Sequence, residues 1–229
     1  MNPYIFREYD IRGIVETDFT PEVVTLLGRA FGTFVKRAGG KRISISGDVR
    51  ITTPRLKKNF AQGILKTGIN VLDMGIVPTP ANYFSMFSLD VNGAVQITGS
   101  HNPPEFNGFK ISYNQCAFYG NQIQDLRKFV ENRDFETGMG TIEEIDILTS
   151  YQSMLKEKIS ISRPMKAVID CGNATACLSA PEIFPAVGIE TRELYCDIDG
   201  TFPNHHPDPT EDNNLIELIK QVQSGDYEF

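Results

Sequence analysis

The chain has no long apolar run and no excess of positive charge, and each absence excludes a class of protein. Its 229 residues carry 29 acidic side chains against 22 Lys and Arg, so the formal net charge is −7 and the pI is near 5.0. A protein of this charge does not bind nucleic acid through a general positive field. The N-terminus is polar from Arg7 to Arg12 and has no apolar signal core. We therefore expect no membrane span and no secretion, and a cytoplasmic location.

Cysteine and histidine are scarce, and their spacing suits neither disulfides nor zinc. The four cysteines are Cys116, Cys171, Cys177 and Cys196. We expect them to be small buried apolar side chains. His205 and His206 are adjacent and are followed by a proline, which is not the spacing of metal ligands. We therefore predict no zinc site.

Apolar residues at helical spacing alternate with short apolar runs over most of the chain, and 41% of its residues are hydrophobic. The spacing predicts helices over 20–37, 53–67, 79–87, 123–130, 148–159 and 211–223 and partly helical structure over 174–187. Strands are predicted over 43–46, 69–72, 94–97, 111–113, 167–169 and 189–195. This alternation is typical of an α/β fold. We expect a three-layer α/β/α domain with a mostly parallel, mixed sheet, followed by an incomplete second α/β domain.

Two kinds of local signal mark the ends of these elements. Thr20, Thr53 and Thr79 each stand directly before a proline, which is the pattern of a helix cap followed by the first helical residue. We expect Thr210 to cap the last helix. Residues 133–145 are rich in glycine and acidic side chains and have no apolar period, which indicates a linker. The predicted domains are residues 1–135 and 164–229, with a linker and bridging helix over 136–163.

Polar motifs follow consecutive strands of the predicted sheet. Asp48 and Arg50 follow the first strand, residues 75–80 follow the second, and Ser100 follows the third, at 94–97. In open α/β sheets, ligands bind at the carboxyl ends of the strands, so we expect a ligand site here.

Ser100 lies in a turn that suits a residue carrying phosphate. Gly99 permits a tight turn, and Pro103 and Pro104 stiffen the exit. The hydroxyl would then face solvent near the backbone amides of residues 99–102. From turn chemistry alone, an ordinary strand-to-loop turn is the alternative.

The stretch TGSHNPPEFNGFK, residues 98–110, closely resembles the phosphoserine loop of the α-D-phosphohexomutases, the phosphomannomutase/phosphoglucomutase family. Other stretches resemble motifs of that family in the same order. They are residues 6–13, 46–50, 75–80, 170–173 and 199–209. Gly47 departs from the family pattern, which often has arginine there. The resemblance covers essentially the whole chain.

The resemblance implies a reaction that moves phosphate between O1 and O6 of a hexose through a phosphoserine and a hexose 1,6-bisphosphate. Ser100 would be the phosphoserine and a ligand of a bridging Mg²⁺ ion. The other residues of the implied catalytic group are Arg12, His101 and Lys110. Residues implied to bind substrate or phosphate are Tyr9, Arg50 and Asn102. The implied partner is a phosphosugar, either a mannose or a glucose phosphate.

Members of the family that this chain resembles have four domains, and three of their loops have no counterpart in the 229 residues. These loops are the D-G-D-G-D-R metal loop, the sugar-recognising loop and the C-terminal phosphate-binding loop. We therefore expect a fragment that is inactive alone and self-associates through its incomplete second domain.

Two other functions fit parts of the sequence. Asp197 and Asp199 form the D-x-D-G-T motif of haloacid-dehalogenase-like phosphatases, in which the first aspartate attacks phosphate. Too few residues follow Thr201 to supply the rest of such a site. The second alternative is a non-catalytic oligomerising fragment. A serine-hydrolase pair of Ser100 and His101 is disfavoured, because neighbours on an extended chain point to opposite faces.

Overall fold

The computed structural model describes residues 1–229 and divides into two compact units. The first comprises residues 1–100 and 104–146, and the second comprises residues 101–103 and 147–229. Because our predicted linker began at residue 136, the structure extends the first unit further than the sequence suggested.

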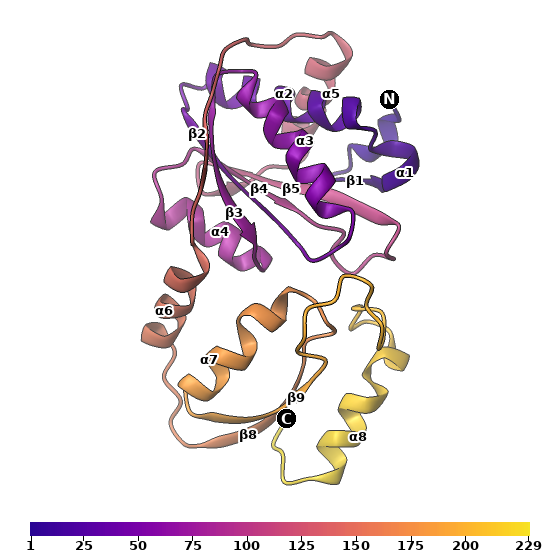
Figure 1. Cartoon of the computed structure of the whole chain (residues 1–229), viewed down its shortest axis with the longest axis vertical. Coiled ribbons are helices and arrows are strands. Elements are labelled where there is room, and N and C mark those ends of the chain that lie inside the picture. The colour runs from indigo at the N-terminus through magenta and orange to yellow at the C-terminus, as the bar shows by residue number, and fades with distance from the viewer. The chain divides into compact units, whose positions relative to one another are not determined.

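A seven-stranded mixed sheet forms the middle layer of the first unit (Figure 1). Its strands are β1 (Ile11–Ile14), β2 (Arg42–Gly47), β3 (Asn70–Ile76), β4 (Gly93–Ile97), β5 (Phe106–Tyr113), β6 (Cys116–Ala117) and β7 (Ile142–Glu144). The order is β1-β5-β4-β2-β3-β7, and β6 pairs with β5. Strands β4, β2, β3 and β7 are parallel, whereas β5 is antiparallel to both β4 and β1.

Helices cover both faces of this sheet. They are α1 (Val15–Asp18), α2 (Pro21–Arg37), α3 (Thr53–Leu65), α4 (Thr79–Ser88) and α5 (Asn121–Glu131). Helices α2, α3 and α5 contribute to the apolar core on one face, and α4 lies on the other (Figure 1). The expected three-layer arrangement is present.

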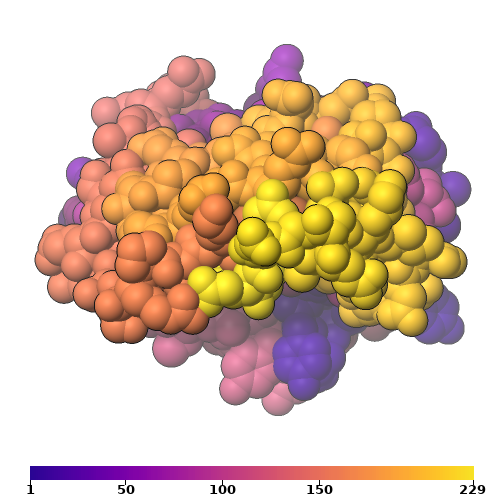
Figure 2. All heavy atoms as spheres, turned by 90° about the horizontal axis from the view of Figure 1, so that it is seen from below, coloured from indigo at the N-terminus to yellow at the C-terminus, as the bar shows by residue number.

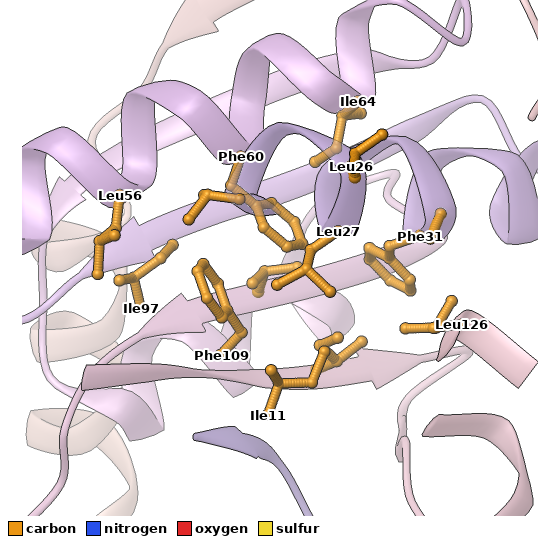
Figure 3. Packing of buried hydrophobic residues seen from close by; sticks show 14 of the residues in the cluster. Ile11, Leu26, Leu27, Phe31, Leu56, Phe60, Ile64, Ile97, Phe109 and Leu126 are labelled. Carbon is orange, nitrogen blue, oxygen red and sulfur yellow. The ribbon is translucent and has the colours of Figure 1, made fainter. Parts of the chain in front are cut away.

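The apolar core lies between the sheet and helices α2 and α3 (Figure 3). Ile43 and Ile45 of β2 are fully buried in it, with Phe60 of α3 and Phe109 of β5. The Phe60 and Phe109 rings stack with their centroids 4.8 Å apart. Alternation along β2 turns Ile43 and Ile45 toward this core and Ser44 and Ser46 toward α4.

Helices α2 and α3 cross in backbone contact. A Cβ atom on Gly28 would lie 2.1 Å from the Phe60 carbonyl oxygen, and one on Gly63 would lie 2.2 Å from the Thr25 carbonyl oxygen. Only glycine fits at such an approach. This contact fixes α3 along the sheet, and α3 begins beside the candidate site.

Helix α4 packs on the sheet partly through polar groups. Tyr83 and Phe87 are exposed, whereas Asn82 and Ser85 are fully buried. The Ser85 and Ser44 hydroxyls lie 2.7 Å apart, and Asn82 Nδ2 donates to Ser46 Oγ at 2.7 Å. Asn82 Nδ2 also donates to the Val95 carbonyl oxygen.

Three helix caps differ from prediction. Thr20 does cap α2, accepting from the Val23 amide. The residue before α3 is Thr52, and the Thr53 hydroxyl is bonded to Asp48 instead of capping the helix. The residue before α4 is Pro78, with no side-chain cap. Thr210 Oγ1 donates to Asp208, and a 3₁₀ turn at Asp212–Leu215 precedes the last helix.

Residues 136–146, part of the expected linker, are bonded to the first unit. The Glu136 amide donates to Thr33 Oγ1, the Gly138 amide to the Lys66 carbonyl, and the Gly140 amide to the Leu65 carbonyl. Strand β7 then adds to the edge of β3. Backbone hydrogen bonds therefore hold this segment in place. Because such bonds do not depend on side chains, the missing apolar period did not predict them.

The second unit has a smaller parallel sheet of strands β8 (Met165–Asp170) and β9 (Ile189–Leu194). Its helices are α6 (Leu148–Lys158), α7 (Ala180–Ala186) and α8 (Ile216–Ser224). Backbone bonds from Glu228 and to Phe229 pair the C-terminal residues with β8. No residue of α8 is buried, and the yellow C-terminal segment lies on the surface of this unit in Figure 2. No helix of either unit has both the length and the apolar character needed to span a bilayer.

Candidate active site

Ser100 follows β4 at the carboxyl edge of the sheet, and its backbone has an unusual conformation. Its φ is +55°, in the left-handed region, and the residue is exposed. A residue other than glycine occupies this region at a cost of about 1–3 kcal/mol, so neighbouring groups must hold it there. The chain therefore turns at the serine itself, and not at Gly99 as expected. The argument against a Ser–His pair assumed an extended chain, but the backbone is not extended at Ser100.

Hydrogen bonds hold the backbone on both sides of Ser100. The Ser100 amide donates to Thr98 Oγ1 at 2.9 Å, and the Ser100 carbonyl oxygen accepts from Arg50 Nη2 at 2.9 Å. The Gly99 carbonyl oxygen accepts from Arg12 Nη1. We had expected the Gly99 and Ser100 amides to be available to a phosphate. Both instead donate hydrogen bonds within the protein.

Gly99 lets the Arg50 side chain pack closely on the loop. A Cβ atom there would lie 2.4 Å from Arg50 Cζ, so the guanidinium lies directly against the Gly99 backbone. Arg50 is only 2% exposed. Burial lowers the pKa of its guanidinium, Asp48 opposes this effect, and the nearby charge of Arg12 adds to it.

Asp48 joins three elements around this turn. One carboxylate oxygen accepts from Thr53 Oγ1 at 2.6 Å and from the Arg50 amide at 3.0 Å. The other accepts from Thr98 Oγ1 at 2.7 Å and from the Gly99 amide at 3.2 Å, and it lies 3.2 Å from Arg50 Nε. The end of β2, the first turn of α3 and the end of β4 are therefore bonded to one carboxylate.

Arg12 of β1 is buried and oriented by an ion pair. Its side chain is 5% exposed, and Nη2 lies 2.6 Å from Asp10 Oδ2. Its Nε has no hydrogen-bond partner. Arg12 therefore contacts the loop of Ser100 from a buried position, through the Gly99 carbonyl.

Lys110 of β5 lies on the same face of the sheet as Arg12. Arg12 pairs with Gly108 across the two antiparallel strands, and Lys110 is two residues further along β5. Such diagonal neighbours lie about 7–8 Å apart. Lys110 is half-buried, and it makes no hydrogen bond or ion pair. Lys110 is therefore a cation on the Arg12 face of the sheet that no hydrogen bond or ion pair engages.

The other predicted site residues lie at or near the surface. His101 is exposed and Asn102 is half-buried. Tyr9 is 77% exposed, and its ring centroid lies 6.5 Å from that of Tyr119.

The predicted magnesium ion does not find a complete set of ligands in these residues. No group of three His, Cys, Asp or Glu side chains could hold a metal ion. Both oxygens of Asp48 already accept hydrogen bonds, which leaves Ser100 as the predicted oxygen ligand. An oxygen-liganded Mg²⁺ usually takes one or two carboxylates besides phosphate oxygens and water. The magnesium ion stays a prediction of the resemblance.

The phosphatase motif has its second carboxylate engaged in a turn. Asp199 Oδ1 accepts from both the amide and the hydroxyl of Thr201, and these bonds lower the pKa of Asp199. Asp197 is exposed, and its carbonyl oxygen accepts from Asn173. A second carboxylate with a lowered pKa is poorly suited to act as a general acid.

Sequence reasoning missed three residues that build this site. They are Asp10, Thr53 and Thr98, which bond to Arg12 and Asp48. Thr98 stands two residues before the serine, and a side chain at that spacing commonly accepts from the backbone of a turn. Asp10 and Thr53 carry no signal of this kind.

Comparison with known proteins gives the same assignment over nearly the whole chain. Family models described as phosphoglucomutase/phosphomannomutase α/β/α domain I and domain II match residues 3–137 and 149–229. A phosphomannomutase/phosphoglucomutase of Pseudomonas aeruginosa is 42% identical over 96% of this chain. A phosphoglucomutase of Neisseria meningitidis is 40% identical over 98% of it.

A crystal structure of a Burkholderia thailandensis protein of the same description superposes on the chain. The TM-score is 0.95 at 39% identity, with 100% of this chain and 52% of the other covered. The two curated relatives are covered over 48% and 49% of their lengths. The chain therefore spans about half the length of these relatives.

Proposed function

Because the chain belongs to the phosphoglucomutase/phosphomannomutase family, we propose that it supplies the phosphoserine of a phosphohexomutase. The observation that carries this proposal is the exposed Ser100 in a left-handed turn at the carboxyl edge of β4. Arg50 donates to its carbonyl oxygen and Arg12 donates to that of Gly99. Lys110 lies on the same face of the sheet as Arg12 and has no ion pair. The substrate would be a hexose monophosphate.

In the proposed reaction, phosphate moves from Ser100 to the sugar and back. The free hydroxyl of a hexose 1-phosphate attacks the phosphorus on Ser100 Oγ, and the bond from Oγ to phosphorus breaks. The resulting 1,6-bisphosphate reorients in the site. Ser100 Oγ then attacks the phosphorus on O1, the bond from that phosphorus to O1 breaks, and hexose 6-phosphate is released. Phosphoryl transfer depends mostly on positioning and on neutralising charge.

Five of the other predicted residues have a role in this proposal. The ammonium group of Lys110 neutralises charge on the transferred group and exchanges a proton with the sugar hydroxyl. Arg12 adds positive charge behind Gly99. His101 and Asn102 follow the serine and would contact the phosphate, and Tyr9 would contact the substrate from the surface.

A fusion protein tests the proposal. The chain is continued by the second half of the Pseudomonas aeruginosa relative, and glucose 1-phosphate conversion is measured with glucose 1,6-bisphosphate and Mg²⁺. Ser100→Ala should abolish conversion and the phosphate found on the protein by mass spectrometry, whereas Ser88→Ala, on exposed α4 surface, should change neither. Phosphate that persists in Ser100→Ala, or that is found mainly on Asp197, would favour the phosphatase alternative. The 229-residue chain alone should show no conversion.

A further inference from the structure

We propose that Asp48 and Arg50 are a positioning pair that holds Ser100 in its left-handed conformation and thereby sets the direction of its hydroxyl. The proposal rests on the proposed role of Ser100. It assigns Arg50 to the loop and not to the phosphate, where the sequence resemblance had placed it.

Arg50 connects the two ends of the loop. Its Nη2 donates to the Ser100 carbonyl oxygen at 2.9 Å, and its Nη1 donates to the Phe106 carbonyl oxygen at 3.1 Å. The planar guanidinium presents its donors in a fixed fork, so it can bond both carbonyls at once. At 2% exposure and packed on Gly99, this side chain faces the loop backbone.

Asp48 fixes the position from which Arg50 acts. Its carboxylate lies 3.2 Å from Arg50 Nε and accepts the Arg50 amide, so it holds the arginine by both side chain and backbone. The same carboxylate accepts from Thr98 Oγ1, and Thr98 Oγ1 in turn accepts the Ser100 amide. Asp48 therefore reaches both the amide and the carbonyl of Ser100, each through one intermediate residue.

These contacts oppose the backbone strain at Ser100. A serine with φ near +55° relaxes toward negative φ when nothing holds it. That rotation would redirect the side chain, because the Cβ position follows the backbone. Misplacing a reacting oxygen by about 1 Å can cost on the order of 10²-fold in rate. Loss of Arg50 should therefore lower kcat while leaving KM almost unchanged.

The first measurement needs no catalysis and uses the 229-residue chain. A left-handed residue has a short distance between its own amide and α protons, which gives a strong nuclear Overhauser effect. We expect this signal at Ser100 in the unaltered chain and its loss in Arg50→Ala and Arg50→Lys. Backbone hydrogen exchange over residues 98–106 should rise by about tenfold or more, while β2 stays protected.

The Arg50→Lys variant distinguishes the effect of the positive charge from the effect of the guanidinium geometry. Arg50→Lys keeps the positive charge, but its donors share one nitrogen and cannot reproduce the spacing of the guanidinium fork. If charge alone were needed, the lysine variant would restore the Ser100 signal and the activity of the fusion protein. Thr98→Val is the milder variant, because it removes only the link from Asp48 to the Ser100 amide. Arg55→Ala is the matched control, since Arg55 is exposed on α3 and pairs with the exposed Glu16.

In the fusion protein, Arg50→Lys and Thr98→Val should lower kcat by about 10²-fold and about tenfold, with KM within about threefold. An unchanged Ser100 signal in Arg50→Lys and Thr98→Val would overturn the proposal. So would a raised KM at constant kcat, because that would place Arg50 on the substrate. If the unaltered fusion protein shows no mutase activity, the proposed function fails, but the proton signal still decides the positioning role.

Discussion

At the scale of single residues, Arg12 and Lys110 differ in what surrounds their charges. Arg12 is buried, paired with Asp10 and bonded to the Gly99 carbonyl. Lys110 is half-buried and has no partner. A charge without a partner contributes little to folding and is available to a ligand. The two side chains should therefore have similar effects on catalysis and different effects on stability.

Alanine substitutions test this difference. In the fusion protein, Arg12→Ala and Lys110→Ala should each lower kcat/KM by about 10²-fold or more, because both stabilise transferred charge. Arg12→Ala should also lower the free energy of unfolding by about 1–3 kcal/mol, since it leaves Asp10 and the Gly99 carbonyl without their partner. Lys110→Ala should change it by less than about 0.5 kcal/mol. A large loss of stability in Lys110→Ala, measured by urea unfolding, would contradict this assignment.

The cysteines should differ in reactivity. Cys116 is exposed, whereas Cys171 is buried with its Sγ 3.0 Å from Cys196 Sγ. Burial raises the pKa of Cys171 and Cys196, and it raises that of Cys177 to about 11. Because the thiolate is the nucleophile, a raised pKa leaves less reactive thiolate at pH 8.

Iodoacetamide labelling followed by mass spectrometry checks the cysteine prediction. Cys116 should be labelled first at pH 8. Labelling of Cys177 should rise with each pH unit until the pH reaches about 11. Equal rates for Cys116 and Cys177 at pH 8 would contradict the prediction.

At the scale of elements, helix α4 shows what the sequence can and cannot predict. The proline signal and the apolar spacing place the helix correctly at residues 79–88. They do not reveal the polar part of its buried face, on which Asn82 and Ser85 bond to the side chains of Ser46 and Ser44 in β2. Those partners are far away in the sequence, and a helical period carries no information about them. The position of Ser100 at the carboxyl edge of the sheet was predictable, because the serine comes shortly after a predicted strand.

Serines 85 and 88 test the polar packing of this helix. Ser85→Ala removes the bonds of its hydroxyl to Ser44 and to the Asn82 carbonyl, at 2.7 and 2.6 Å. It should destabilise the first unit by about 1–2 kcal/mol, because a buried polar group loses its partner. Ser88→Ala on the exposed face should cost less than about 0.5 kcal/mol. Equal effects in thermal unfolding would show that the buried hydroxyls contribute nothing.

At the scale of the whole molecule, the family and the α/β fold expected from the sequence are confirmed by the matched family models and the superposed structure. Local sequence patterns predicted the structure of the segment between the two predicted domains least well. Residues 136–146 lack an apolar period, yet backbone bonds hold them to the first unit. Residues 159–164, after α6, form neither helix nor strand, and all of them except Ile161 are exposed.

Limited proteolysis should distinguish these segments. Trypsin should cut first after Lys158, which is exposed at the end of α6. Arg163 precedes a proline and should resist cleavage. Cleavage after Arg133 should be slow, because the amides of Arg133 and Asp134 are bonded to α5. An early cut at Arg133, identified by mass spectrometry, would show that the following segment opens readily.

Helix α8 is the basis for the expected self-association. Ile216 and Ile219 are 61% and 48% exposed, and no residue of the helix is buried. Exposed apolar side chains on one helix favour association. Light scattering on the 229-residue chain should show a mass that rises with concentration, and Ile219→Lys should reduce that rise more than Gln223→Lys. A constant monomer mass up to high concentration would contradict the expectation.

The pairing of β1 with β5 also has a consequence for synthesis. Ile11 pairs with Phe109, so the strand made first lies beside one made much later. Ribosomes add about 5–20 residues per second, which gives β1 a wait of roughly 5–20 s. Throughout that interval the nascent chain carries Ile11, fully buried in the finished fold, without its partner strand. The sheet of the first unit therefore cannot close until Ser100, its loop and then β5 have been translated.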